Sequence, residues 1–95
     1  MAVTKTSQQP EPENQMKKQV YIIRTDGDGN IGVCTNAKEI EKLINNYIDA
    51  LGYQNPDKAN YNEVLKIKNQ GWGNMEIDLG ESTAYIEVQR FTLNN

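Results

Sequence analysis

Residues 19–34, QVYIIRTDGDGNIGVC, predict a β-hairpin and decide the fold of the chain. The run at 20–23 is contiguous, β-branched and aromatic, which favours a strand over 19–25 that is covered on both faces. A second short apolar run predicts a strand over 31–34. Between the strands, the residues of DGDGN tolerate positive φ and predict a five-residue loop over 26–30.

The register of this hairpin follows from burial of its apolar side chains. If Thr25 lies opposite Ile31, then Ile23 lies opposite Val33, and Tyr21 joins these apolar residues on one face. Shifting the register by one residue would set the apolar side chains of the second strand beside charged ones. We therefore expect the first register.

The DGDGN tip also resembles the beginning of a calcium loop. Asp26, Asp28 and Asn30 occupy ligand positions one, three and five. The pattern then fails, because Ile31 stands where the loop needs glycine and Ala37 stands where it needs a bidentate glutamate. The tip is therefore interpreted as a turn, and no metal or cofactor is predicted.

A helix is predicted over residues 37–51. Asn36 is a favourable N-cap, Glu39 completes a capping-box pattern, and Gly52 supplies the stop. Apolar residues recur at helical spacing and predict one core-facing stripe. The stripe consists of Ile40, Leu43, Ile44, Tyr47, Ile48 and Leu51.

Residues 61–70 fit either a helix or a strand. A helix is favoured because Asn60 and Glu63 form a second capping pattern, and Tyr61, Val64 and Leu65 share one helical face. A strand is the alternative, because Leu65 and Ile67 alternate with Lys66 and Lys68.

A second hairpin is predicted from strands over 74–79 and 84–93. Matching the apolar faces places Glu76 opposite Glu87, and Asp78 opposite Tyr85, with like charges unfavourably close. The apolar pairs of that register are Leu79 with Ala84, Ile77 with Ile86, and Met75 with Val88. Basic residues nearby would screen the carboxylates, or the carboxylates would contact a basic partner.

The apolar phase of the last strand changes after Arg90. A β-bulge near residues 89–90 would explain the change. Without a bulge, Tyr85, Phe91 and Leu93 form an apolar strip on the outer face of the sheet.

Trp72, the only tryptophan, stands between Gly71 and Gly73. The glycines allow a sharp turn, so the indole is interpreted either as a lid on the core or as an exposed anchor for a partner.

Composition limits the domain organisation and the class of protein. The 95 residues form a single domain over 19–95, preceded by a proline- and amide-rich segment, 1–18, that is predicted to be a flexible arm. The net charge of −3 argues against nucleic acid. One cysteine and no histidine exclude a disulfide scaffold and His-based catalysis. No signal peptide or membrane span is expected, which suggests a cytoplasmic or virion protein.

These observations predict an α+β fold. It consists of a mainly antiparallel sheet of about four strands with one or two helices on one face, in the order ββααββ or alternatively ββαβββ. No specific family motif is present. The leading functional hypothesis is a non-enzymatic protein-interaction module that binds a protein partner or self-associates, without a small-molecule substrate. It is suggested to be a phage-encoded accessory or virion protein because its abundant Asn, Lys and Ile resemble an AT-rich genome.

Two alternatives stay open. One is a small inhibitor of a host defence enzyme that acts through an acidic surface, and the other is a small enzyme or metal-binding protein. The candidate partner-binding residues are Trp72, Glu76, Asp78, Tyr85, Glu87 and Phe91.

Overall fold

The structure, a computed structural model, describes residues 17–94, which form four strands and two helices in the order ββααββ. The elements are β1 (Lys17–Thr25), β2 (Gly29–Cys34), α2 (Ala37–Leu51), α3 (Tyr61–Gln70), β3 (Trp72–Asp78) and β4 (Thr83–Asn94). All neighbouring strands are antiparallel, in the spatial order β2-β1-β4-β3. The predicted α+β fold and the order ββααββ are therefore confirmed, and the alternative ββαβββ is wrong.

Most of the predicted flexible arm lies outside the described residues. Its last two residues, Lys17 and Lys18, begin β1 and pair with the end of β4. The first strand therefore starts two residues earlier than its sequence pattern indicated.

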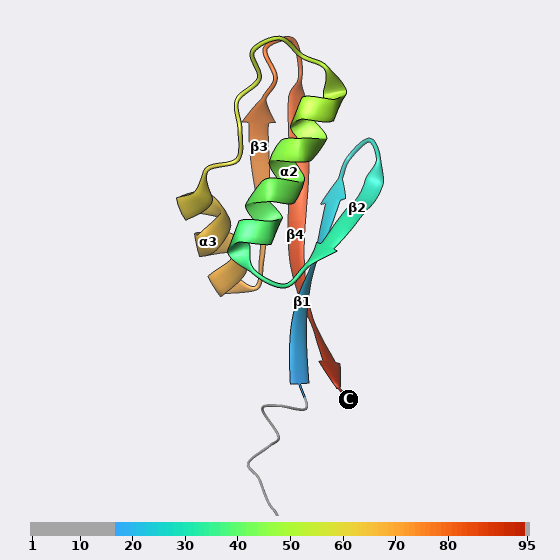
Figure 1. Cartoon of the computed structure of the whole chain (residues 1–95), viewed down its shortest axis with the longest axis vertical. Helices are drawn as coiled ribbons and strands as arrows, with labels where there is room; N and C mark the ends of the chain where they lie inside the picture. The colour runs from blue at the N-terminus through green and yellow to red at the C-terminus, as the bar shows by residue number, and fades with distance from the viewer. Residues whose placement is uncertain (1–16, 95) are drawn as a thin grey trace, which may run out of the picture.

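The fold has two layers, with both helices on the same face of the sheet (Figure 1). The largest fully buried side chains come from both layers: Ile23, Met75, Ile86 and Val88 from the sheet, and Ile40, Ile44, Ile48 and Val64 from the helices. No described element covers the opposite face, which we call the outer face. The prediction that β1 is covered on both faces is wrong, because only alternate residues of β1 are buried.

The predicted helix boundaries and N-caps are confirmed. The Asn36 side chain accepts a hydrogen bond from the Glu39 N–H at 2.9 Å, and Gly52 ends α2 with φ at 83°. The main partner of the Glu39 carboxylate is Thr35 rather than Asn36. The carboxylate accepts hydrogen bonds from the backbone N–H and hydroxyl of Thr35, at 2.8 and 3.0 Å, and these bonds lower the pKa of Glu39. Leu51, predicted to face the core, is 38% exposed.

The second segment is also helical, as the capping signals predicted. The Asn60 side chain accepts hydrogen bonds from the N–H groups of Asn62 and Glu63. Gly71 adopts φ of 88° and ends α3 immediately before β3. The short connection turns the chain back onto the sheet, so Val64 and Ile67 are buried.

The register predicted for the first hairpin is wrong. Ile23 lies opposite Gly32 and Ile22 lies opposite Val33, with an irregularity after Ile23. The extra residue lets Ile31 pack against the core while Val33 turns outward and is 64% exposed. The two-residue periodicity assumed for the prediction does not hold across such a bulge.

The register predicted for the second hairpin is wrong by two residues, although the residues keep their faces. Ile77 lies opposite Ala84, so Glu76 faces Tyr85 instead of Glu87, and Asp78 faces Thr83. The turn lies one residue earlier than predicted, over residues 79–82 instead of 80–83: the Leu79 N–H donates to the Ser82 carbonyl at 2.9 Å, and the Gly80 N–H donates to the Asp78 carboxylate at 2.8 Å. Leu79 leaves the strand and remains buried.

The last strand has no bulge at residues 89–90. The ladder with β1 runs through this region in continuous register, and the ladder with β3 is regular up to its end at Gln89. The apolar residues after Arg90 therefore lie on the outer face, which is the arrangement expected without a bulge.

Candidate protein-binding face

The outer face is built by the side chains that alternate with the core-facing residues of the four strands. The six sequence-predicted site residues, Trp72, Glu76, Asp78, Tyr85, Glu87 and Phe91, all lie on this face, according to their strand pairing and burial. β3 and β4 supply three of them each. The geometry therefore brings these six residues onto a single surface of the protein.

One half of the outer face is apolar. We define the apolar zone by its residues: Val20, Ile22, Val33, Trp72, Phe91 and Leu93. Strand pairing aligns Trp72, Ile22 and Val33 in one row across the sheet, with Gln89 between the first two. Phe91 pairs with Val20 in the next row, and Leu93 follows.

The side chains of this zone are large and poorly covered. The exposed fractions are 64% for Val33, 53% for Trp72, 47% for Leu93 and 42% for Phe91. Single exposed apolar residues are ordinary on a protein surface, but a contiguous set marks an interaction site.

The apolar zone continues onto a two-stranded ribbon. β1 and β4 extend past the helices in Figure 1, and the pairing of β2 and β3 stops before residues 17–20 and 90–94. Gln19 and Thr92 are exposed on the inner side of the ribbon. A two-stranded ribbon without a covering layer is only marginally stable in water.

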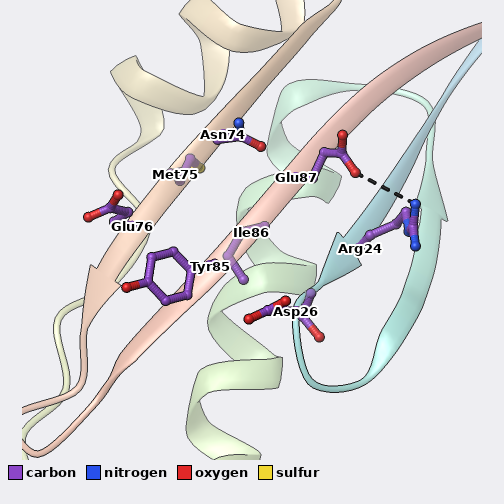
Figure 2. A pocket seen from close by; sticks show the side chains of 9 residues that line it. Arg24, Asp26, Asn74, Met75, Glu76, Tyr85, Ile86 and Glu87 are labelled. Carbon is purple, nitrogen blue, oxygen red and sulfur yellow. Dashed lines mark ion pairs between the residues drawn. The ribbon is translucent and has the colours of Figure 1, made fainter.

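The other half of the outer face is acidic. We define the acidic zone by Asp26, Glu76, Asp78, Tyr85 and Glu87. Four of these residues line a shallow hollow of about 570 Å³ together with Arg24 (Figure 2). Only Asp78 lies outside that hollow, and it lines a neighbouring one.

Arg24 and Glu87 lie where the two zones meet. Arg24 Nη1 is 3.8 Å from Glu87 Oε1, and the Trp72 indole N–H donates to the other carboxylate oxygen at 3.2 Å (Figure 2 shows the ion pair). Both charged side chains are partly exposed, so the pair contributes less than about 1 kcal/mol. Its main effect is to hold the edge of the indole, which orients Trp72 along the sheet.

The carboxylates of the acidic zone do not face one another across the strands. Asn74 pairs with Glu87, and the basic neighbour of Glu87 is Arg24 on β1. The prediction that Glu76 lies directly opposite Glu87 is therefore wrong.

Sequence reasoning missed half of the apolar zone. Val20 and Ile22 were assigned to a strand covered on both faces, and Val33 was assigned to the core. Gly32 was the available signal for the outward position of Val33. Leu43 packs so closely against position 32 that only glycine fits there, and the neighbouring residue, Val33, then faces outward. Trp72 was predicted as a lid or an anchor, and the lid interpretation is wrong because Trp72 lies in β3 and points away from the core.

The DGDGN tip has a structural role in the fold. The Tyr47 hydroxyl donates to the Asp28 carboxylate at 2.6 Å, and the Asp28 N–H donates to the Thr25 hydroxyl at 2.9 Å. Partial burial and the bond to Asp28 raise the pKa of Tyr47. These contacts join the hairpin to α2. Across residues 17–94, no group of three or more His, Cys, Asp or Glu is placed to hold a metal ion.

Cys34, the single cysteine, is buried on the core side of β2. Burial, and secondarily the charge of Glu39, raises the pKa of the thiol to about 11. The thiol is therefore protonated at neutral pH and is a packing residue rather than a nucleophile.

No helix between residues 17 and 94 has both the length and the apolar character that crossing a membrane requires. The chain matches no protein-family model, no curated protein and no solved structure. The function is therefore argued from the outer face.

Proposed function

We propose that this protein is a non-enzymatic interaction module that holds another protein on its outer face. The observation that carries the proposal is the alignment of large, half-exposed side chains on the one sheet face that no described element covers. Aromatic residues such as Trp72, Tyr85 and Phe91 contribute much of the binding energy in protein interfaces, because they bury a large area with few rotatable bonds.

The acidic zone defines the chemistry of the partner. Asp26, Glu76 and Asp78 are exposed around Tyr85, and only Glu87 has a basic neighbour within the zone's hollow. A partner with Lys or Arg beside an apolar contact residue complements this surface. Such charges at the rim of an interface raise the association rate and make binding sensitive to salt.

The inhibitor hypothesis is a specific version of the same proposal, in which the basic partner surface is the active site of an enzyme. The hollow beside Tyr85 supports this version, because the carboxylates that line it, Asp26 and Glu76, complement a basic side chain of the enzyme. The phage or virion origin stays a prediction from composition.

Site-specific photo-crosslinking in source cells tests the proposed function. p-Benzoylphenylalanine replaces Tyr85 on the outer face or, as the matched control, Asn46 on the exposed side of α2. We expect position 85 to cross-link a distinct protein and position 46 to give none, and irradiation in an extract of the same cells should give less product at high salt. Equal products at both positions, or none at position 85, would contradict the proposal.

A further inference from the structure

We infer that the apolar zone of the outer face binds a second copy of this chain, so that two sheets pack face to face and leave two acidic zones free. This inference rests on the proposed function, because the dimer would present the acidic zones to the partner. It assigns the apolar zone, with Trp72 and Phe91, to the second copy, and it leaves Tyr85 and the acidic zone as the surface that holds the partner.

The first argument is the area of the zone. Aromatic side chains bury about 150–250 Å² when fully covered. Trp72 and Phe91 expose about half of theirs, and Val33 and Leu93 add a comparable area. The zone therefore offers on the order of 500 Å² per copy, or about 1,000 Å² per pair, which meets the lower limit for a specific interface.

The second argument is the ribbon formed by the ends of β1 and β4. Val20, Phe91 and Leu93 lie on its outer side, and no described element contacts that side. A facing sheet from a second copy covers the ribbon along its whole length, which a single side chain or a short turn cannot do. Packed sheets interdigitate their side chains at a spacing of about 10 Å.

The segment before Lys17 is a poor occupant of the same surface by composition. Residues 1–16 contain only Met1, Ala2, Val3 and Met16 as apolar residues, apart from two prolines. Four small or flexible apolar side chains at the two ends of the segment do not match a continuous strip of six. A second copy supplies an apolar strip of the same length on a regular sheet.

Charge selects the arrangement of the two copies. A two-fold axis along the strands keeps the two acidic zones at the same level, so that the acidic half of one sheet lies over the acidic half of the other, which is unfavourable. An axis across the strands, through the row of Phe91 and Val20, sets these two residues against their own copies and brings Trp72 beside Leu93 of the other copy. Ile22 then lies over Lys18, whose long side chain reaches solvent at the rim. This axis also sends the two acidic zones to opposite ends of the dimer.

Analytical ultracentrifugation of the full chain tests the stoichiometry. An interface of this size predicts weak, reversible dimers that grow between about 10 μM and 1 mM. Phe91→Lys places two like charges at the axis and should weaken dimerisation at least about 10-fold. Val33→Lys, which lies in a different strand, should also weaken dimerisation. Agreement between the two variants would show that the effect does not come from misfolding at one position. Leu51→Lys, an exposed apolar residue on the helical layer, should have no effect.

Spin labels on Thr83→Cys test the arrangement, since Cys34 is buried and does not compete for the label. Position 83 lies eight residues from Phe91 along β4, or about 27 Å at 3.4 Å per residue. The proposed axis doubles this separation to about 50 Å between the two labels, whereas an axis along the strands would bring them to within about 10–15 Å.

Each outcome is decisive for the inference. Dimers that Phe91→Lys and Val33→Lys weaken, with labels about 50 Å apart, support it. A chain that is monomeric at about 1 mM overturns it, as do dimers sensitive only to Leu51→Lys or labels that lie close together. If the chain is monomeric but position 85 still cross-links a distinct protein, the inference fails and the proposed function stands. If the chain dimerises and position 85 cross-links no other protein, the proposed function fails.

Discussion

Replacing Gly32 with alanine should destabilise the domain, because the bulged register of the first hairpin points this residue at α2. A Cβ atom at position 32 would lie 2.5 Å from Leu43 Cδ2 and 3.1 Å from Cδ1. Leu43 is half-buried and can move in part, so the overpacking cost is on the order of 1–2 kcal/mol. The loss of glycine's freedom in the unfolded chain offsets about 0.4–1 kcal/mol of this cost.

The net loss is therefore about 1 kcal/mol, which lowers the Tm of a domain of this size by about 4–8 °C. Thermal and urea denaturation followed by circular dichroism measure the loss. Gly27→Ala is the matched control, because a Cβ atom there meets nothing within 4 Å. The double variant Gly32→Ala/Leu43→Ala should lose less stability than the two single losses combined, since the shortened side chain removes the clash.

The sign of the Gly32→Ala effect decides between two registers. In the register expected from periodicity, Gly32 faces outward and the substitution stabilises the protein by about 0.4–1 kcal/mol. A stabilised or unchanged Gly32→Ala variant would refute the bulge and, with it, the outward position of Val33.

Three further predictions concern stability. Asn36→Ala removes the cap that binds the Glu39 N–H and should cost about 1 kcal/mol in urea denaturation; an unchanged midpoint would contradict the cap. The raised pKa of Cys34 means that the thiol ionises less readily in the folded state than in the unfolded state. The contribution of the protonated thiol to the free energy of unfolding is therefore complete below pH 9, and it falls by about 2–3 kcal/mol as pH rises to about 11. Cys34→Ala should remove that part of the alkaline loss, and an identical pH profile would argue against the raised pKa. Tyr47→Phe removes the hydrogen bond to Asp28 and should cost about 1 kcal/mol with faster amide exchange at the hairpin tip, whereas unchanged exchange would show that the bond does not hold the tip.

Local sequence signals predicted the helices well. The boundaries of α2 and α3 follow from residues that act within one turn, such as Asn36, Gly52 and Asn60. Those residues satisfy backbone groups locally, so their effect is visible in the sequence without knowledge of tertiary contacts.

Strand register was predicted poorly because it depends on turns and on contacts far along the chain. The bulge before Gly32 leaves this glycine facing Leu43 of α2, and the shift in the second hairpin follows from a turn around Gly80 that begins one residue earlier than predicted. Both errors came from assuming that apolar alternation continues up to the turn.

The candidate site was predicted in part for the same reasons. The acidic and aromatic residues of β3 and β4 alternate with core residues, so periodicity placed them on a single face. Val20, Ile22 and Val33 joined the site only through the order of the strands, which sets β1 beside β4 and β2 at the edge. That order is a property of the whole fold and has no local signature.

The most direct test of the outer face as an interface is fluorine NMR of Trp72. The chain has one tryptophan, so incorporating 5-fluorotryptophan yields one resonance, which comes from the apolar zone of the outer face. We predict that this resonance shifts and broadens when the dilute chain is concentrated or added to extract of its source cells. An unchanged, sharp resonance under dilute, concentrated and extract conditions would show that Trp72 stays in water and would contradict the proposed role of the outer face.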